Sequence, residues 1–298
     1  MINGITHENQ GFNIINLESD KLSKINEVYI CPSFLCNLNC PHCTLKNLPS
    51  KMNVDSICNT LSYLNKNSGN NLIYDLFGGE PLLLNVEIIN RIYNIIKERK
   101  YLVSTNLLHY NESKHSSLFK DAEWINVSWN PKRFTNDQYK LWIKILDSLK
   151  LFKLNAMVTL TNDLITDFTP QEFIKLLKQW DVYSIDFDYF IGKDDENDEL
   201  IDNWLCELYD IWDIKTKYNI ADGIKNALLT NTRYKDCSNH YTIMPSGNIK
   251  YGCAYWETDV IKTKCLMCEL YSFCNGGCRL ETKCTFPKKL YYKIRDEI

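Results

Sequence analysis

Three cysteines have the spacing in this chain that points most directly to chemistry. Cys36, Cys40 and Cys43 lie within eight residues, in the run Cys-Asn-Leu-Asn-Cys-Pro-His-Cys. A residue of extended chain spans about 3.5 Å at most, so the three sulfurs can converge on one small object. Two objects suit such a group of thiols: a structural zinc ion with four ligands, or an iron–sulfur cluster held by cysteine thiolates.

The number of ligands separates these two objects. No fourth cysteine follows within the loop, so zinc would need His42 or a distant residue to complete its tetrahedron. Three thiolates on a four-iron cluster leave one iron without a protein ligand, and that iron can bind a small molecule. The spacing therefore favours the cluster, with zinc as the alternative.

A second group of residues follows about one β/α unit later. Gly78, Gly79, Glu80 and Pro81 come at the end of a predicted strand, a place where parallel sheets bind ligands. Glycines let a ligand approach the backbone closely, and the Glu80 carboxylate can accept hydrogen bonds from an ammonium group. An ordinary tight turn is the alternative for this group.

CxxxCxxC followed by GGEP resembles the signature of the radical SAM superfamily. The resemblance covers roughly residues 27–190. It implies a partial (β/α)6 barrel with a four-iron cluster that binds S-adenosylmethionine (SAM). Reductive cleavage of SAM would give methionine and a 5′-deoxyadenosyl radical, which abstracts hydrogen from a C–H bond. The resemblance also implies which residues bind SAM, namely His42 near the adenine, Gly78, Gly79, Glu80 and Pro81 near the amino group, and Ser104, Asn106 and Ser128 at strand ends.

The C-terminal part of the chain contains a second set of cysteines. Its members are Cys237, Cys253, Cys265, Cys268, Cys274, Cys278 and Cys284. Their order resembles the SPASM extension of radical SAM enzymes, which carries two auxiliary four-iron clusters and would bring the total to three. A zinc ribbon is the alternative. The chain departs from the usual pattern in two gaps, because 247–253 has one extra residue and 253–265 is very short.

The SPASM resemblance also implies how these cysteines are shared. The outer cluster would be held by Cys265, Cys268, Cys274 and Cys284. The inner cluster would be held by Cys237, Cys253 and Cys278, which leaves it one protein ligand short. The candidates for the fourth ligand are Asp236, His240, Cys206 or the substrate itself.

The elements that must position these residues alternate between strand and helix. Strands are predicted at 27–30, 72–77, 101–104, 124–129, 153–160 and 182–190, and most are followed by a helical pattern. Such alternation predicts an α/β fold with a parallel sheet or barrel. Helices are also expected at 200–217 and 220–230, between the barrel and the cysteine-rich segment.

One face of the predicted sheet is partly polar. Asn126 and Ser128 alternate with apolar residues, and so do Ser184, Asp186 and Asp188. A polar face enclosed by a barrel would line a lumen that holds a polar ligand; a half-solvated sheet is the alternative. Two carboxylates on such a face raise the free energy unless they bind something, so Asp186 and Asp188 are candidate catalytic residues.

Composition limits the class of protein. The chain has 298 residues, 45% of them apolar, thirteen cysteines and a net charge of −3. The charge argues against nucleic acid as a partner. No apolar run is long enough for a membrane span, and residues 1–20 do not resemble a signal peptide. We therefore expect a cytoplasmic protein, with cysteines that bind metal rather than form disulfides.

The expected domain organisation follows from these patterns. It consists of an N-terminal arm at 1–26, the partial barrel at 27–192, a helical bridge at 193–236, the SPASM domain at 237–285 and a tail at 286–298. The arm is too short for a separate peptide-recognition domain. Leader recognition would therefore use the barrel, the bridge or a separate leader-binding protein.

The resemblance implies a substrate class, because SPASM enzymes mostly act on peptides or proteins. The leading hypothesis is a thioether or carbon–carbon cross-link in a ribosomally made precursor peptide, with a flavodoxin- or ferredoxin-type reductant. A formylglycine-generating, anaerobic sulfatase-maturing activity is the second hypothesis, for which the chain looks short. Peptide epimerisation is a third, and needs a hydrogen-donor thiol such as Cys58 or Cys206. An electron carrier or zinc-stabilised binding protein is the alternative outside enzymes.

Overall fold

The computed structural model describes residues 22–41, 43, 45, 51–189, 198–234, 240–252, 268–274 and 286–298. Predictions for His42, Asp236 and several C-terminal cysteines lie outside these residues; those cysteines are Cys237, Cys253, Cys265, Cys278 and Cys284. The chain divides into two compact units, each described by itself. The first is Met1–Val127 with Cys237–Trp256, and the second is Ser128–Asp236 with Glu257–Ile298.

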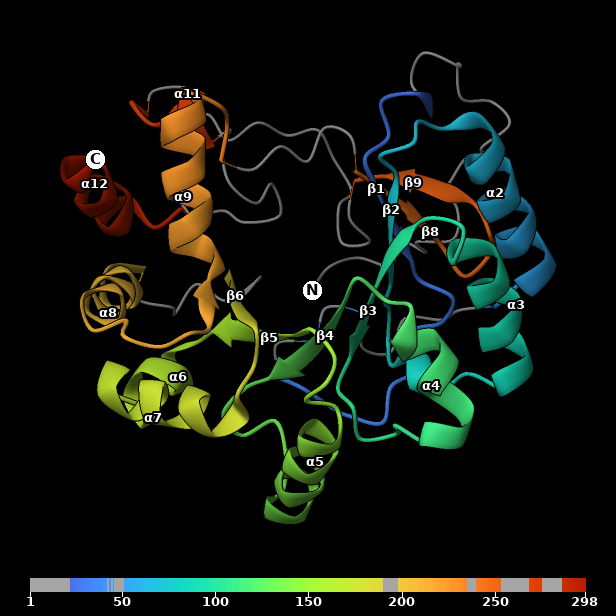
Figure 1. Ribbon diagram of the computed structural model, residues 1–298, viewed down its shortest axis with the longest axis horizontal. Coiled ribbons are helices and arrows are strands. Elements are labelled where there is room, and N and C mark those ends of the chain that lie inside the picture. The colour runs from blue at the N-terminus through green and yellow to red at the C-terminus, as the bar shows by residue number, and fades with distance from the viewer. Residues whose placement is uncertain are drawn as a thin grey trace, which may run out of the picture. The chain divides into compact units, whose positions relative to one another are not determined.

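The first unit is built on a mostly parallel sheet (Figure 1). Its strands are β1 (Glu27–Ile30), β2 (Ile73–Leu76), β3 (Lys100–Thr105), β4 (Trp124–Trp129, which continues into the second unit), β8 (His240–Ile243) and β9 (Ile249–Tyr251). The order is β4-β3-β2-β1-β8-β9. All neighbours are parallel except β8 and β9, which form an antiparallel hairpin. The predicted α/β class with parallel strands is confirmed.

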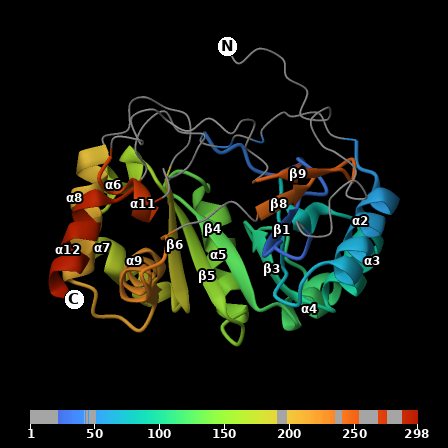
Figure 2. The ribbon, with the colours of Figure 1, turned by 90° about the horizontal axis from the view of Figure 1, so that it is seen from above.

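Helices cover one face of this sheet (Figures 1 and 2). They are α2 (Val54–Asn67), α3 (Val86–Ile96) and α4 (Glu112–Lys120), with the short 3-10 turn η3 (Pro81–Leu83) before α3. The Tyr74 hydroxyl donates to the Asn65 side-chain oxygen of α2 at 2.7 Å, and the Tyr101 hydroxyl donates to the Leu118 carbonyl of α4 at 2.6 Å. Side chains alternate along a strand, so Asp75 and Ser104 lie on the opposite face.

The β8–β9 hairpin packs closely against α2. Gly247 has a φ of +86°, and a Cβ there would lie 2.2 Å from the Ser56 hydroxyl oxygen. The Thr60 hydroxyl donates to the Gly247 carbonyl at 2.8 Å. Glycine is required by both the conformation and the close approach. Residues 240–251, which the sequence analysis assigns to the cysteine-rich domain, thus belong to the first unit's sheet.

The second unit contains β5 (Leu154–Leu160), β6 (Ser184–Tyr189) and the short β7 (Lys217–Tyr218), which pair in parallel in that order. Its helices are α5 (Asn136–Ser148), α6 (Asn162–Asp167), α7 (Pro170–Trp180), α8 (Asp198–Asp210), α9 (Asn219–Thr230), α11 (Tyr271–Cys274) and α12 (Lys288–Glu297). Aromatic rings fill its core: Trp129 lies 4.8 Å from Trp180, and Phe173 lies 5.4 Å from Trp204, between ring centroids.

The helix expected at 200–217 is shorter than predicted. α8 ends at Asp210, and the chain then returns to the sheet as β7. Thr216 donates from its hydroxyl to the Val182 carbonyl at 2.9 Å, and the Lys217 N–H donates to the Tyr183 carbonyl at 2.9 Å. Hydrogen bonds to the two residues directly before β6 therefore replace the backbone hydrogen bonds that a longer helix would make.

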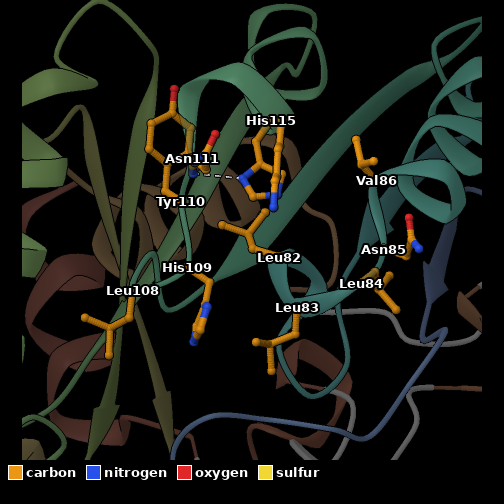
Figure 3. A pocket seen from close by; sticks show the side chains of 11 residues that line it. Leu82, Leu83, Leu84, Asn85, Val86, Leu108, His109, Tyr110, Asn111 and His115 are labelled. Carbon is orange, nitrogen blue, oxygen red and sulfur yellow. Dashed lines mark hydrogen bonds between the residues drawn. The ribbon is translucent and has the colours of Figure 1, made fainter.

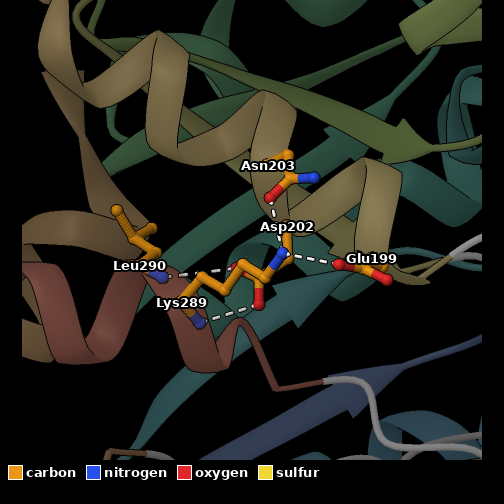
Figure 4. A network of polar contacts seen from close by, with 5 residues as sticks. All are labelled: Glu199, Asp202, Asn203, Lys289 and Leu290. Atoms are coloured by element: carbon orange, nitrogen blue, oxygen red, sulfur yellow. Dashed lines mark hydrogen bonds and ion pairs between the residues drawn. The ribbon is translucent and has the colours of Figure 1, made fainter.

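A buried carboxylate on α8 caps the start of α12 (Figure 4). Asp202 is 8% exposed, and it accepts hydrogen bonds from the backbone N–H groups of Lys289 at 2.8 Å and Leu290 at 3.3 Å. The Lys289 ammonium contacts Glu199 at 2.9 Å and Asn203 at 2.8 Å. These contacts fasten the end of the chain to α8.

Asp202→Ala is expected to lower the free energy of unfolding by about 1–3 kcal/mol, because it leaves N–H groups of α12 without an acceptor. Urea denaturation measures this change. Asn203→Ala, which removes only the side-chain contact to Lys289, is the matched control and should change stability by less than about 0.5 kcal/mol. Equal effects of the two variants would contradict the capping role.

Within the described residues, no helix has both the length and the apolar character needed to cross a membrane.

Candidate cofactor site

The loop that carries the three cysteines begins directly after β1. The Cys31 N–H donates to the Ile243 carbonyl of β8 at 2.9 Å, which anchors the start of the loop. Cys40 is buried, whereas Cys36 and Cys43 are exposed. The Cys43 N–H donates to the Cys40 carbonyl at 3.1 Å, so a tight turn brings these two residues together.

The turn after β2 holds this cysteine loop in place. The Gly79 N–H donates to the Ser33 carbonyl at 2.9 Å, and the Glu80 N–H donates to the Leu35 carbonyl at 2.7 Å. A Cβ on Gly78 would lie 2.6 Å from the Ser33 carbonyl oxygen, and one on Gly79 would lie 2.1 Å from that of Leu35. Gly78 also has a φ of +135°. The two glycines thus allow the cysteine loop of the same chain to approach the turn closely. The sequence analysis expected them to allow the close approach of a ligand.

The Glu80 carboxylate joins two segments through three hydrogen bonds. It is 3% exposed. Its Oε1 accepts from the Leu82 N–H at 3.0 Å and the Thr105 hydroxyl at 2.6 Å, and its Oε2 accepts from the Asn106 N–H at 2.7 Å. Pro81 follows as the first residue of η3, where its missing N–H costs no hydrogen bond. Glu80 therefore fixes the turn after β2 against the end of β3.

Asn106 continues this network to the cysteine loop. Its Nδ2 donates to the Asn37 side-chain oxygen at 2.9 Å and lies 3.9 Å from the Cys36 sulfur. Asn106 is 2% exposed. Two of the residues predicted to bind SAM, Glu80 and Asn106, are thus brought together with Cys36 by direct hydrogen bonds.

The chemistry of the donors suits an iron–sulfur cluster. The loop offers three thiols, two of them exposed, and thiolates are the ligands that such clusters use. Among the described residues, no three Cys, His, Asp or Glu side chains are grouped closely enough to hold a single metal ion. Cys36, Cys40 and Cys43 would hold a cluster, and Gly78, Gly79 and Glu80 would border the molecule bound to it.

A buried acid that the sequence analysis missed lies on the polar face of the same sheet. Asp75 of β2 is 5% exposed. The Ser104 hydroxyl donates to its carboxylate at 2.9 and 3.0 Å, and the Asn126 Nδ2 donates to the Ser104 hydroxyl at 3.0 Å. Burial raises the pKa of Asp75 to about 7, against the Ser104 hydrogen bonds, which lower it, while the negative charge of Glu27 raises it further. A charged residue inside an apolar strand was the signal for this site.

Polar side chains share one face of the sheet, as predicted. Ser104, however, does not have the orientation expected of a residue that donates to SAM. It was assigned to SAM, and its hydroxyl proton points to Asp75 instead. A hydroxyl has one proton to donate. While it bonds to Asp75, Ser104 can only accept a hydrogen bond from a further group.

In the second unit the candidate catalytic residues have partners within the chain. Asp186 Oδ2 accepts from the side-chain amides of Asn155 at 3.1 Å and Asn219 at 2.8 Å. The Ser184 hydroxyl donates to Asn155 at 2.7 Å. Asp188 is exposed. Asp186 and Asp188 were proposed as catalytic because buried carboxylates without partners raise the free energy. Amides donate to Asp186 and Asp188 is exposed, so neither carboxylate needs a bound ligand for that reason.

The remaining predicted residues are distributed over both units. Ser128 is half-buried at the end of β4, in the second unit. Cys268 is half-buried and Cys274 is buried, on either side of the start of α11. His240, a candidate fourth ligand, contacts Glu27 of β1 at 3.3 Å. Cys206 lies on α8, where burial raises the pKa of its thiol to about 11.

Comparisons with known proteins identify the fold. No protein-family model matches the chain. A segment of 118 residues is 29% identical to an uncharacterized protein of Archaeoglobus fulgidus, a match that covers 38% of this chain and only 28% of that protein.

Solved structures match far more of the chain. The structure of anSMEcpe with bound AdoMet (SAM) has a TM-score of 0.72 and 16% identity, covering 91% of this chain and 95% of that one. SuiB of Streptococcus suis bound to S-adenosylmethionine has a TM-score of 0.60 and 14% identity, covering 87% of this chain and 74% of that one. The chain therefore has the fold of the radical SAM enzymes. Its fold is similar to the folds of anSMEcpe and SuiB.

Glu80→Ala is expected to weaken SAM binding about tenfold or more while leaving bound iron unchanged, because a lost charge-assisted hydrogen bond costs about 1.5–3 kcal/mol. Equilibrium dialysis with labelled SAM and an iron assay measure both quantities. Thr105→Val removes one donor to the carboxylate but keeps the carboxylate, and is the matched control. Unchanged SAM affinity in Glu80→Ala would mean that residues 78–81 serve only as a structural turn.

Proposed function

We propose that this chain is a radical SAM enzyme that modifies a peptide. The observation that carries the proposal is the direct contact between the cysteine loop and the turn at residues 78–81, through two backbone hydrogen bonds and two glycines. The fold supports it, since anSMEcpe has been solved with AdoMet and the Cp18Cys peptide, and SuiB with the precursor peptide SuiA.

In this proposal Cys36, Cys40 and Cys43 hold the cluster, and SAM lies against the turn. The group held there would supply radical chemistry, namely hydrogen abstraction from the peptide by a 5′-deoxyadenosyl radical made from SAM. The Glu80 carboxylate accepts a hydrogen bond from the Asn106 N–H and so holds Asn106 against the turn. The Asn106 side-chain amide in turn contacts the loop at Cys36. Such prior ordering is how a protein contributes to chemistry supplied by a cofactor. The two auxiliary clusters and an external flavodoxin- or ferredoxin-type reductant are part of the same proposal.

For the product we propose a cross-link, either a thioether or a carbon–carbon bond, in a precursor peptide. The second candidate is formylglycine formation, for which the chain looked short from its sequence. The match to anSMEcpe covers 94% of that chain in the complex with the Cp18Cys peptide. Chain length therefore does not distinguish between the two products.

The proposed thiol donors for epimerisation lie on helices. Cys58 is on α2, where it contacts Arg91 of α3, and burial raises the pKa of its thiol. Cys206 is on α8, near Asp202 and near Lys293 of α12. Both thiols lie among residues of neighbouring helices, which gives no support to a hydrogen-donor role.

The test is to incubate the anaerobically reconstituted protein with SAM, dithionite and peptides encoded beside its gene. We expect 5′-deoxyadenosine and a modified peptide. A cross-link removes two hydrogens from the peptide, and a thioether also blocks alkylation of its cysteine thiol. Formylglycine formation from cysteine removes two hydrogens and also replaces sulfur by oxygen, and epimerisation in D2O introduces deuterium. Absence of SAM cleavage by cluster-loaded protein would overturn the proposal.

A further inference from the structure

A pocket of about 660 Å³ lies in the first unit, beside the turn that carries Glu80 (Figure 3). One wall is formed by residues 82–86, from η3 to the start of α3. The other is formed by residues 108–111 with Lys114 and His115, where the chain enters α4. Nothing in the proposed cofactor site uses these side chains. The volume is typical of a ligand pocket in a protein.

The pocket wall contains a buried hydrogen-bond donor. His115 is 2% exposed, and its Nδ1 accepts from the Asn111 N–H at 3.0 Å (Figure 3). Burial, aided by the nearby charges of Lys114 and His109, lowers the pKa of His115 to about 4, so the ring is neutral at pH 7. Its proton must then be on Nε2. No hydrogen bond between described residues uses that atom.

The electrostatics of the pocket favour an anion. Among the described residues that line it, Lys114 carries a full positive charge and none has a carboxylate. Helices α3 and α4 both begin at the pocket, and the first N–H groups of a helix carry partial positive charge. α4 begins without a side-chain cap. Glu87 and Glu112, the acids in the first turns of these helices, are outside the lining.

The rest of the lining is mixed. Leucine and valine side chains from residues 82–86 and Leu108 lie beside the polar side chains of Asn85, His109 and Asn111. Leu83 and Val86 are 39% and 36% exposed, so apolar surface reaches the rim. A ligand that fills this space needs polar and apolar groups beside its charge, as a peptide segment has.

We propose that this pocket binds a peptide segment in which a carboxylate side chain stands between apolar side chains, with Lys114 and the His115 Nε2–H as the groups that bind the carboxylate. Only the choice of a peptide rests on the proposed function. The pocket is in a position where a bound substrate could also reach the proposed cofactor site. Glu80 accepts hydrogen bonds from Leu82 in one wall and from Asn106, which precedes the other wall in the chain. The bound segment would thus contact both segments that Glu80 joins.

The test uses two probes that differ in one side chain, dansyl-Leu-Asp-Leu-amide and dansyl-Leu-Asn-Leu-amide, in fluorescence titrations of the reconstituted full-length protein. We expect the aspartyl peptide to bind about tenfold more tightly, the effect of one charge-assisted interaction. Lys114→Ala and His115→Gln should each reduce that preference. Lys120→Ala, which removes the same charge from the last turn of α4, should leave it unchanged.

Equal affinity for the two peptides, or no binding of either at millimolar concentration, would overturn the proposal. So would an equal loss in Lys114→Ala and Lys120→Ala. Lys114 is at the surface, so its variant tests the proposal even if His115→Gln does not fold. SAM cleavage is measured on the same preparation. Its absence together with a retained aspartyl preference would remove the proposed enzyme function and leave the pocket proposal intact.

Discussion

Replacing Cys36, Cys40 and Cys43 together by alanine is expected to abolish reductive SAM cleavage and to remove about a third of the bound iron, since one of three proposed four-iron clusters loses its ligands. These thiols lie in a loop that is fastened to β8 and to the turn after β2 by backbone groups. The backbone contacts do not depend on the thiols, so the variant should keep its fold. Iron assay, 5′-deoxyadenosine release and circular dichroism measure the three quantities.

Cys58→Ala is the control for this variant. Cys58 is a buried thiol of α2 outside the loop, and its removal should leave iron content and SAM cleavage unchanged. SAM cleavage that persists in the triple variant would contradict both the site and the proposed function. A loaded wild-type protein that contains zinc and no iron would contradict them as well.

The second large effect is expected from Asp75→Asn, as a change in how stability depends on pH. Burial raises the pKa of Asp75 to about 7 in the folded protein, whereas an unfolded aspartate has a pKa of about 3.9. Between these values the folded state keeps a proton that the unfolded state has lost, so stability falls as pH rises. The loss reaches up to about 4 kcal/mol above pH 7.

Asparagine resembles the protonated acid and does not ionise, so the variant should not show this loss. Urea denaturation of the apo-protein should therefore find Asp75→Asn more stable than wild type at pH 8 and similar to it near pH 4. Asp137→Asn changes an exposed acid on α5, with 97% of its side chain accessible, and serves as the control. Parallel pH profiles for wild type and Asp75→Asn would show that Asp75 ionises normally.

Local patterns in the sequence predicted much of this architecture. Alternation of apolar and polar residues predicted the strands and the polar faces, because the two-residue period of a strand can be recognised in a few consecutive residues. Proline favours the first turn of a helix, and α7 begins at Pro170. The two groups of residues at 36–43 and 78–81 were recognised from residue types and spacing, and the structure holds the second group against Ser33 and Leu35, directly before the first.

Contacts between distant segments could not be predicted in the same way. Asp75 was overlooked because its burial depends on neighbouring strands, and its partner Ser104 comes from β3. The three hydrogen bonds of Glu80 depend on where β3 ends. The helix at 200–217 was predicted too long. The hydrogen bonds of Thr216 and Lys217 to the residues directly before β6 depend on the tertiary structure, which local patterns do not show.

The pairing of β1 with β8 has a consequence for biosynthesis. β1 leaves the ribosome before β8, and strands β2 to β7 are synthesised between them. Until then one side of β1 presents unpaired backbone groups, which can pair with other chains. The cysteine loop also lacks its anchor to Ile243 during this interval. Completion of the first unit must therefore wait until synthesis has passed β8, and under the proposed function so must the binding of iron by the loop.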